Sequence, residues 1–136
     1  MKASGILAAL MALAPICGPA QTSQPDGGAS AFAVKVGLAM YRDADWGWLC
    51  EHSNMPLEAC RTMLGTMFMS QGSPRMGNSG VKGVRVTDLR LEDRGRSARV
   101  ELEIEYEDPG ALGEFVDFDL VRNENSRWLW DKLPDK

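Results

Sequence analysis

Hydrophobic and polar positions change their period once along this chain, close to residue 80. Between Ser30 and Phe68 the apolar residues recur at spacings of three and four, which predicts helices that each bury one stripe. From Val81 onward apolar and charged residues alternate, which predicts strands. Helices followed by a meander of strands predict an α+β domain in which N-terminal helices pack on a curved antiparallel sheet.

The helical part divides into three expected segments. The first covers residues 30–41, with Ser30 as its N-cap. The second is a short turn over residues 46–50. The third has Ser53 and Asn54 as candidate caps and Pro56 in its first turn, where its missing N–H costs nothing, and it places Cys60 on its core side. A Gly-rich stretch, residues 71–80, then predicts a long loop.

The first expected strand has an irregular pattern. Val84 and Val86 share one parity, whereas Leu89 and Leu91 have the other. Either the strand contains a bulge near Thr87, or both of its faces are covered. The pattern alone leaves these two alternatives open.

The remaining three strands are expected over residues 98–106, 115–121 and 127–133, joined by polar turns. The strand 98–106 alternates most regularly, with apolar residues on one side and a ladder of glutamates on the other. This alternation predicts one face against the core and one face in water. The glutamate ladder is expected to be a solvated face, with a cation or a basic partner as the functional alternative.

The chain begins with the pattern of a cleavable secretory signal peptide. A short basic start precedes an apolar run, residues 6–16, which is too short to cross a bilayer as a helix. Small residues before the cut favour cleavage after Ala20. Cys17 raises the alternative of a lipid anchor, but Ile16 stands where that signal requires a small residue. The expected location is therefore extracytoplasmic, either secreted or periplasmic.

Removal of residues 1–20 leaves a length suited to one domain. Residues 21–29 are polar and rich in Gly, Ser and Pro, which predicts a flexible spacer before a single domain over residues 30–136. The whole chain has a formal net charge of −4, and the loss of Lys2 makes the mature chain still more acidic. This charge argues against nucleic acid or an anionic membrane surface as the main partner.

Cys50 and Cys60 remain after cleavage. An even number of cysteines in an oxidising compartment predicts a disulfide between them. Its expected role is to join two helical segments, because the C-x-x-C spacing of redox-active pairs is missing.

Two stretches of the sequence resemble a known family. They are Tyr41-Arg42-Asp43-Ala44-Asp45-Trp46 leading to Leu49-Cys50, and the closing Leu120 to Trp130 with its polar turn and Trp-containing strand. In this layout the chain resembles small exported domains of the nuclear transport factor 2-like (cystatin-like) superfamily. The resemblance implies a cone-shaped fold that encloses a pocket. It also implies kinship with ketosteroid isomerases, dehydratases, polyketide cyclases and noncatalytic binding modules, but no catalytic acid–base pair of such enzymes maps onto this sequence.

Aromatic residues are the main candidates for a pocket or an interface. The set comprises Tyr41, Trp46, Trp48, Trp128 and Trp130. Paired aromatic residues at a spacing of two can line a pocket or anchor a partner. Burial in the core is the alternative, and the sequence does not decide between them.

Other candidate chemistries are weaker. His52 between the two cysteines, together with nearby methionines, could start a metal site, but bridged cysteines cannot be ligands. Asp43 and Asp45 are expected to cap a helix rather than to act as general acid and base. The sequence therefore predicts no catalytic residue, no metal and no cofactor.

The favoured interpretation is a noncatalytic exported module that binds an unidentified protein or an apolar small molecule, with a homodimer through the sheet face as a further expectation. A small pocket enzyme of the ketosteroid isomerase or polyketide cyclase kind is the first alternative. A metal-handling protein is the second.

Overall fold

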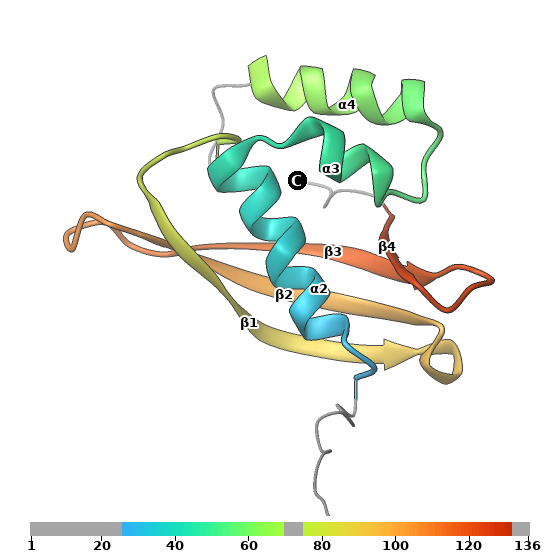
Figure 1. Ribbon diagram of the computed structural model, residues 1–136. Helices are drawn as coiled ribbons and strands as arrows, with labels where there is room; N and C mark the ends of the chain where they lie inside the picture. Colours follow the sequence, from blue (N-terminus) through green and yellow to red (C-terminus); the bar gives the residue numbers. More distant parts are fainter. Residues whose placement is uncertain (1–25, 70–74, 132–136) are drawn as a thin grey trace, which may run out of the picture.

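The computed structural model describes residues 26–69 and 75–131. It is an α+β structure, as the sequence predicts, with helices packed on one face of a four-stranded antiparallel sheet of order β1-β2-β3-β4 (Figure 1). The helices are α2 (Ala29–Gly37), a π-helical segment (Leu38–Asp43), α3 (Trp46–Glu51) and α4 (Leu57–Met69). The strands are β1 (Val81–Glu92), β2 (Ser97–Tyr106), β3 (Glu114–Arg122) and β4 (Trp128–Trp130), and a 3-10 turn (Asp93–Gly95) joins β1 to β2. The expected leader, Cys17 and most of the expected spacer lie outside the described residues.

The strand β1 contains the bulge that the change of parity suggests. Val86 pairs with Leu102 and Asp88 pairs with Glu101, so Thr87 is the extra residue. This bulge returns Leu89 to the same side of the sheet as Val86. The first of the two sequence interpretations is therefore confirmed.

Helix α2 crosses the inner face of the sheet at a close approach. A Cβ atom placed on Gly37 would lie 2.7 Å from Leu102 Cδ1 and 3.2 Å from Val84 Cγ2. Large side chains fill the space between helices and sheet, and among those fully or almost fully buried are Met40, Phe118 and Trp130. The lack of a side chain at Gly37 allows these two layers to meet.

The N-terminus of α2 differs from the sequence prediction. Asp26, rather than Ser30, caps the helix: its carboxylate accepts hydrogen bonds from the backbone N–H groups of Gly28 at 2.9 Å and Ser30 at 3.0 Å. Burial raises the pKa of the Asp26 carboxyl, but the hydrogen bonds from Ser30 and Gly28 outweigh burial and hold that pKa below its usual value. Ala29, which falls in the expected spacer, is helical and fully buried. A carboxylate three residues before the first residue of α2 thus replaces the serine hydroxyl as the cap.

The first helix does not end at Tyr41 as an α-helix. It changes into the π-helical segment after Gly37, and Ala44 closes that segment in the left-handed region with a φ of 49°. The segment carries Met40 and Tyr41 into the core. Asp45 then caps α3, because its side chain accepts a hydrogen bond from the backbone N–H of Trp48.

Helix α4 lies farthest from the strands, and α3 lies between α4 and the sheet (Figure 1). Helix α4 packs chiefly against α3, and it buries Cys60 and Leu64. No described helix is both long and apolar enough to cross a bilayer.

The last strand is shorter than the sequence predicts. It covers Trp128–Trp130 instead of residues 127–133, and residues 132–136 lie outside the described part. Although β4 is an edge strand, its outer side is covered: Trp130 N–H donates to the His52 carbonyl at 3.0 Å, and Asn54 N–H donates to the Trp130 carbonyl at 2.8 Å. The segment that joins α3 to α4 therefore protects this edge.

Candidate functional site

The predicted disulfide between Cys50 and Cys60 is confirmed. It joins α3 to α4 across a sequence separation of 10 residues, with a Cα–Cα distance of 5.7 Å. Both cysteines are buried. They hold α4 on the helical layer and are not free for metal binding.

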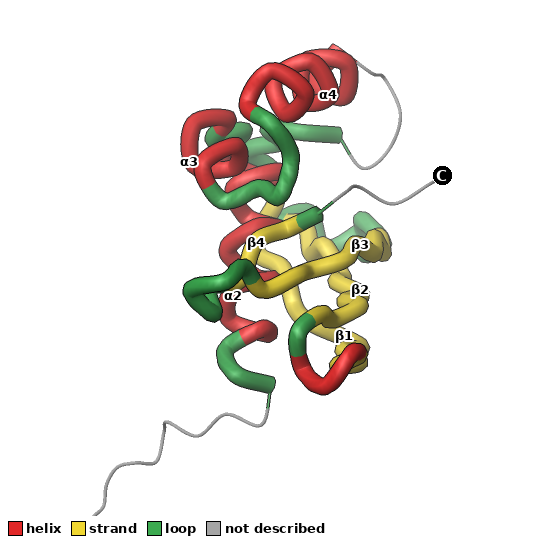
Figure 2. The backbone as a smooth tube through the Cα atoms, turned by 90° about the vertical axis from the view of Figure 1, so that its right-hand side faces the viewer, coloured by secondary structure: helices red, strands yellow, loops and turns green. Residues whose placement is uncertain are grey.

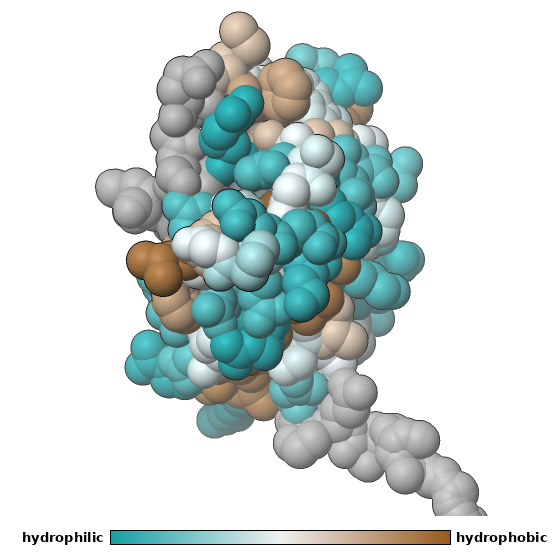
Figure 3. Space-filling view, turned by 90° about the vertical axis from the view of Figure 1, so that its left-hand side faces the viewer, coloured by the Kyte–Doolittle hydropathy of each residue, from teal (hydrophilic) through white to brown (hydrophobic). Residues whose placement is uncertain are grey.

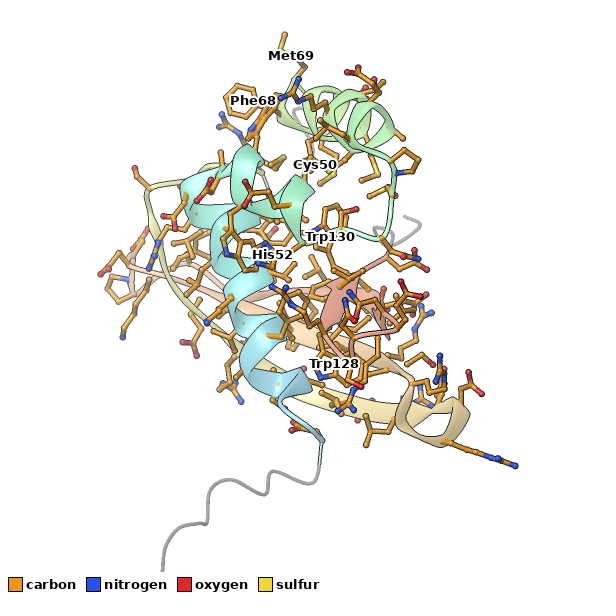
Figure 4. The ribbon with its side chains drawn as sticks, turned by 45° about the vertical axis from the view of Figure 1, so that its right-hand side comes forward. Cys50, His52, Phe68, Met69, Trp128 and Trp130 are labelled. Carbon is orange, nitrogen blue, oxygen red and sulfur yellow. A yellow bond between two sulfur atoms is a disulfide. The ribbon has the colours of Figure 1, made fainter. Side chains whose placement is uncertain are left out.

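Trp128 and Trp130 are core residues. Trp130 is fully buried, and its indole Nε1–H donates to the Leu49 carbonyl at 2.8 Å (Figure 4). The Trp128 indole donates to the Gly27 carbonyl at 2.9 Å, and the Arg122 guanidinium stacks 4.6 Å from its ring centroid. These two tryptophans connect β4 to the helical part of the chain, because the indole N–H of each donates a hydrogen bond to a backbone carbonyl there.

Trp46 and Trp48 belong to two different aromatic groups. Trp46 meets Phe68 of α4 edge-on, with ring centroids 5.8 Å apart. Trp48 stacks on His52 at 4.1 Å and lies 5.8 Å from Phe32. The aromatic set that the sequence suggests therefore does not converge on one site.

His52 is held by its own helix. Its Nδ1 lies 2.8 Å from the Trp48 carbonyl, and because a carbonyl oxygen only accepts, Nδ1 carries the proton of this hydrogen bond. Within residues 26–69 and 75–131, no group of three or more His, Cys, Asp or Glu side chains is arranged to hold a metal ion. The methionines near His52 in the sequence have different environments: Met76 is buried, whereas Met69 is 75% exposed.

Two tyrosines and a carboxylate meet near the end of the π-helical segment. The hydroxyl of Tyr106 donates a hydrogen bond to the Glu114 carboxylate. Burial, this hydrogen bond and the negative charge of Glu114 raise the pKa of Tyr106. Burial also raises the pKa of Tyr41, and the nearby Tyr106 and Asp117 add to that effect. This is the one phenol–carboxylate hydrogen bond in the described part of the chain.

The outer face of the sheet is not covered by any described helix. Figure 2 shows the helices on one side of the strands and none on the other. The register assigns to this outer face the carboxylates of Asp88, Glu92, Glu101, Glu103, Glu105, Asp117 and Asp119, and the guanidinium groups of Arg85, Arg90 and Arg99. Carboxylates are in clear excess there, whereas the two signs are nearly balanced over the rest of the described residues.

Three carboxylates on this face form a row across three strands. Asp88 on β1 is directly opposite Glu101 on β2, and Glu101 is directly opposite Asp117 on β3. Side chains directly opposite on one face have Cβ atoms roughly 5 Å apart, and like charges in such pairs are destabilising. We name Asp88, Glu101 and Asp117 the carboxylate row.

The arginines of the face only partly neutralise it. Arg85 pairs with Glu103 and Glu105, outside the row. At the two ends of the row, Arg90 lies 3.8 Å from Asp88 and Arg99 lies 3.8 Å from Asp117. Arg99 lies closer, at 3.2 Å, to Asp119. Within the described residues Glu101 has no basic partner; its carboxylate accepts a hydrogen bond from the Thr87 hydroxyl at 2.8 Å. The centre of the row therefore lacks a cation.

An exposed aromatic ring lies beside the carboxylate row. Phe115 is directly opposite Glu103 on the outer face and is 56% exposed. Leu112, in the turn before β3, is 87% exposed. The alternation of β3 places Phe115 on the polar side, but only the strand register reveals its position next to the row.

A second group of exposed apolar side chains lies on α4. At the end of this helix Met69 points away from the body of the protein and is 75% exposed, whereas Phe68 packs against Trp46 on one side and is 50% exposed (Figure 4). Figure 3 shows that hydrophobic residues on the side it draws form separate patches among hydrophilic ones. The outer sheet face differs from this group in combining an aromatic ring with a concentrated charge.

These features define a small α+β protein in which the described helices cover one face of the sheet and leave the other face uncovered. Comparison of the chain with protein-family models, curated proteins and solved structures finds no match.

Proposed function

We propose that this chain is an exported, noncatalytic interaction module that binds a protein partner through the outer face of its sheet. The single observation that carries the proposal is the open face itself, where exposed Phe115 lies beside the carboxylate row. Aromatic anchors surrounded by polar groups are typical of protein interfaces. The opposite face is unsuited to this role because α2 covers it.

Export is supported by two features. The first residues have the pattern of a secretory leader, and the Cys50–Cys60 bridge is of a kind that persists in oxidising compartments. Intact-mass analysis of protein purified from the producing cells tests this step. The expected mass corresponds to a chain that begins at Gln21 with both cysteines oxidised, and a chain that retains residues 1–20 would contradict it.

Association of two copies face to face is disfavoured on this surface. Such a dimer would place the carboxylate row of one copy against carboxylates of the other. A different protein is therefore the partner that the charge favours, and the homodimer expected from the sequence becomes an outcome of the experiment.

Site-specific photo-crosslinking tests the proposal. A photoreactive phenylalanine analogue replaces Phe115 in one variant and Phe68 in a matched variant on the helical layer. We expect a discrete covalent adduct with another protein at position 115 and none at position 68. An adduct only at position 68, or adducts at neither position, would overturn the assignment of the sheet face.

A second candidate function is a small pocket enzyme of the ketosteroid isomerase or polyketide cyclase kind. The Tyr106–Glu114 hydrogen bond favours it, because such chemistry needs a carboxyl group and a proton donor side by side. The raised pKa of Tyr106 disfavours it, since a general acid works best with a pKa near the operating pH. Turnover of a β,γ-unsaturated ketosteroid by the wild type, lost in Glu114→Gln, would establish this alternative.

A further inference from the structure

We infer that the occupant of the outer sheet face is an arginine- or lysine-bearing segment of another protein, whose cationic side chain lies over Glu101 in the carboxylate row. The inference rests on the proposed function and specifies the charged side chains by which the partner binds.

The first step of the argument is the cost of the row to the isolated protein. Glu101 has a carboxylate directly opposite it on both neighbouring strands, Asp88 on one side and Asp117 on the other. Opposed like charges lower the stability of a sheet. A cation supplied by a partner would offset this repulsion. Binding of the partner would therefore also stabilise the sheet.

The second step concerns the kind of cation. No metal-holding group of acidic side chains is found within the described residues, so the three carboxylates do not converge on one point as the ligands of a metal ion do. They follow the direction perpendicular to the strands, over two strand spacings or about 10 Å. A guanidinium or ammonium group on a flexible side chain can bind along such a row, because it needs no fixed coordination geometry.

The third step is the aromatic ring beside the row. Phe115 lies one pair along β3 from Asp117 and is open to solvent. A guanidinium can stack on an aromatic ring while it hydrogen-bonds to a neighbouring carboxylate, and the two contacts strengthen each other's hold on the side chain. Phe115 and the carboxylate row together therefore favour the planar guanidinium of arginine over the ammonium group of lysine.

Fluorescence anisotropy with a defined probe tests the inference. The probe is a labelled peptide of alternating arginine and serine, and the negative probe alternates glutamate and serine. The face variant is Asp88→Asn/Glu101→Gln/Asp117→Asn. The charge-matched control is Glu51→Gln/Glu58→Gln/Glu124→Gln, which removes the same charge from exposed positions away from the face.

We expect the wild type and the control to bind the arginine peptide at low salt and the face variant to bind about tenfold more weakly, with affinity that falls as salt rises. Phe115→Ser should also weaken binding, and Phe68→Ser should not. Urea unfolding of each variant verifies that it is folded.

Equal weakening by the face variant and the control would overturn the inference, because the effect would then follow net charge alone. Binding of the glutamate peptide, or a wild-type dimer that Phe115→Ser dissociates, would overturn it too. Failure of the broader proposal is distinguishable: an adduct at position 115 with no arginine-peptide binding leaves the interaction module standing and refutes only the cationic partner.

Discussion

Glu101 and Asp117 face each other directly across β2 and β3 on the solvent side of the sheet, with Asp88 opposite Glu101 on the other flank. Like charges in opposed pairs weaken a sheet, so this arrangement carries a cost in the isolated protein. Arg90 and Arg99 each lie 3.8 Å from one end of the row, at Asp88 and Asp117, and within the described residues neither pairs with Glu101. On the function proposed above, a cation from the partner would relieve this repulsion at Glu101.

Because α2 approaches the sheet closely at Gly37, we predict that alanine substitutions at two helical glycines change the free energy of unfolding in opposite directions. Gly37→Ala should lower the free energy of unfolding by about 1–3 kcal/mol, because the added methyl group overlaps the buried Leu102 side chain. Gly47→Ala should raise it by up to about 1 kcal/mol, because α3 gains helix propensity and the nearest atom is 3.9 Å away. Urea unfolding of both variants measures the difference, and a stabilising Gly37→Ala would contradict the described packing.

The anchoring of β4 predicts a large effect at Trp130. Trp130→Phe should lower the free energy of unfolding by about 2–4 kcal/mol, since it leaves the buried Leu49 carbonyl without its donor and opens space in the core. Exposed Leu112→Ala provides the control and should change stability by less than about 0.5 kcal/mol. Equal effects at the two positions would refute the role given to the indole hydrogen bond.

The disulfide should stabilise the helical layer. Replacing both Cys50 and Cys60 by alanine should cost about 3 kcal/mol on the chain-entropy model for a separation of 10 residues. The wild type should show the same loss when a reductant is added, whereas the double variant should not respond to it. Urea unfolding with and without reductant makes the comparison, and a reductant-insensitive wild type would contradict the prediction.

The tyrosines predict a loss of stability at high pH. Burial raises the pKa of both Tyr41 and Tyr106 above the value of about 10 expected in the unfolded chain. The neutral phenols therefore stabilise the fold fully below that pH, and the free energy of unfolding falls as the pH rises above it.

Ultraviolet titration of tyrosinate measures this effect, because the chain contains only these two tyrosines. Glu114→Gln should lower the pKa of Tyr106, since it removes a neighbouring negative charge. Tyr106→Phe assigns the remaining signal to Tyr41. Ionisation of both tyrosines near their ordinary pKa in the folded wild type would contradict the described environment.

Much of the fold follows from local patterns in the sequence. The alternation over residues 98–106 predicts β2 and its buried face, and the change of parity around Thr87 indicates a bulge without proving it. The even pair of cysteines predicts the bridge. These features depend on neighbours in the chain or on the compartment, so the sequence carries enough information for them.

Features that depend on contacts between distant segments could not be predicted in this way. Ser30 is a good cap former, yet Asp26 lies close enough to take its place. Trp130 is buried at a sheet edge because residues 52–54 cover it. The carboxylate row exists only through the strand register, since its members are far apart in the sequence.

The central claim is that the outer sheet face binds a cationic partner. Measuring both the free energy of unfolding and the affinity for the arginine peptide in Glu101→Gln tests this claim most directly. Glutamine keeps the acceptor for the Thr87 hydroxyl and removes only the charge. We predict that the free energy of unfolding rises by about 0.5 kcal/mol while the arginine peptide binds more weakly, and that Glu51→Gln changes neither quantity. A Glu101→Gln variant that is less stable, or that binds the peptide as tightly as the wild type, would contradict the account.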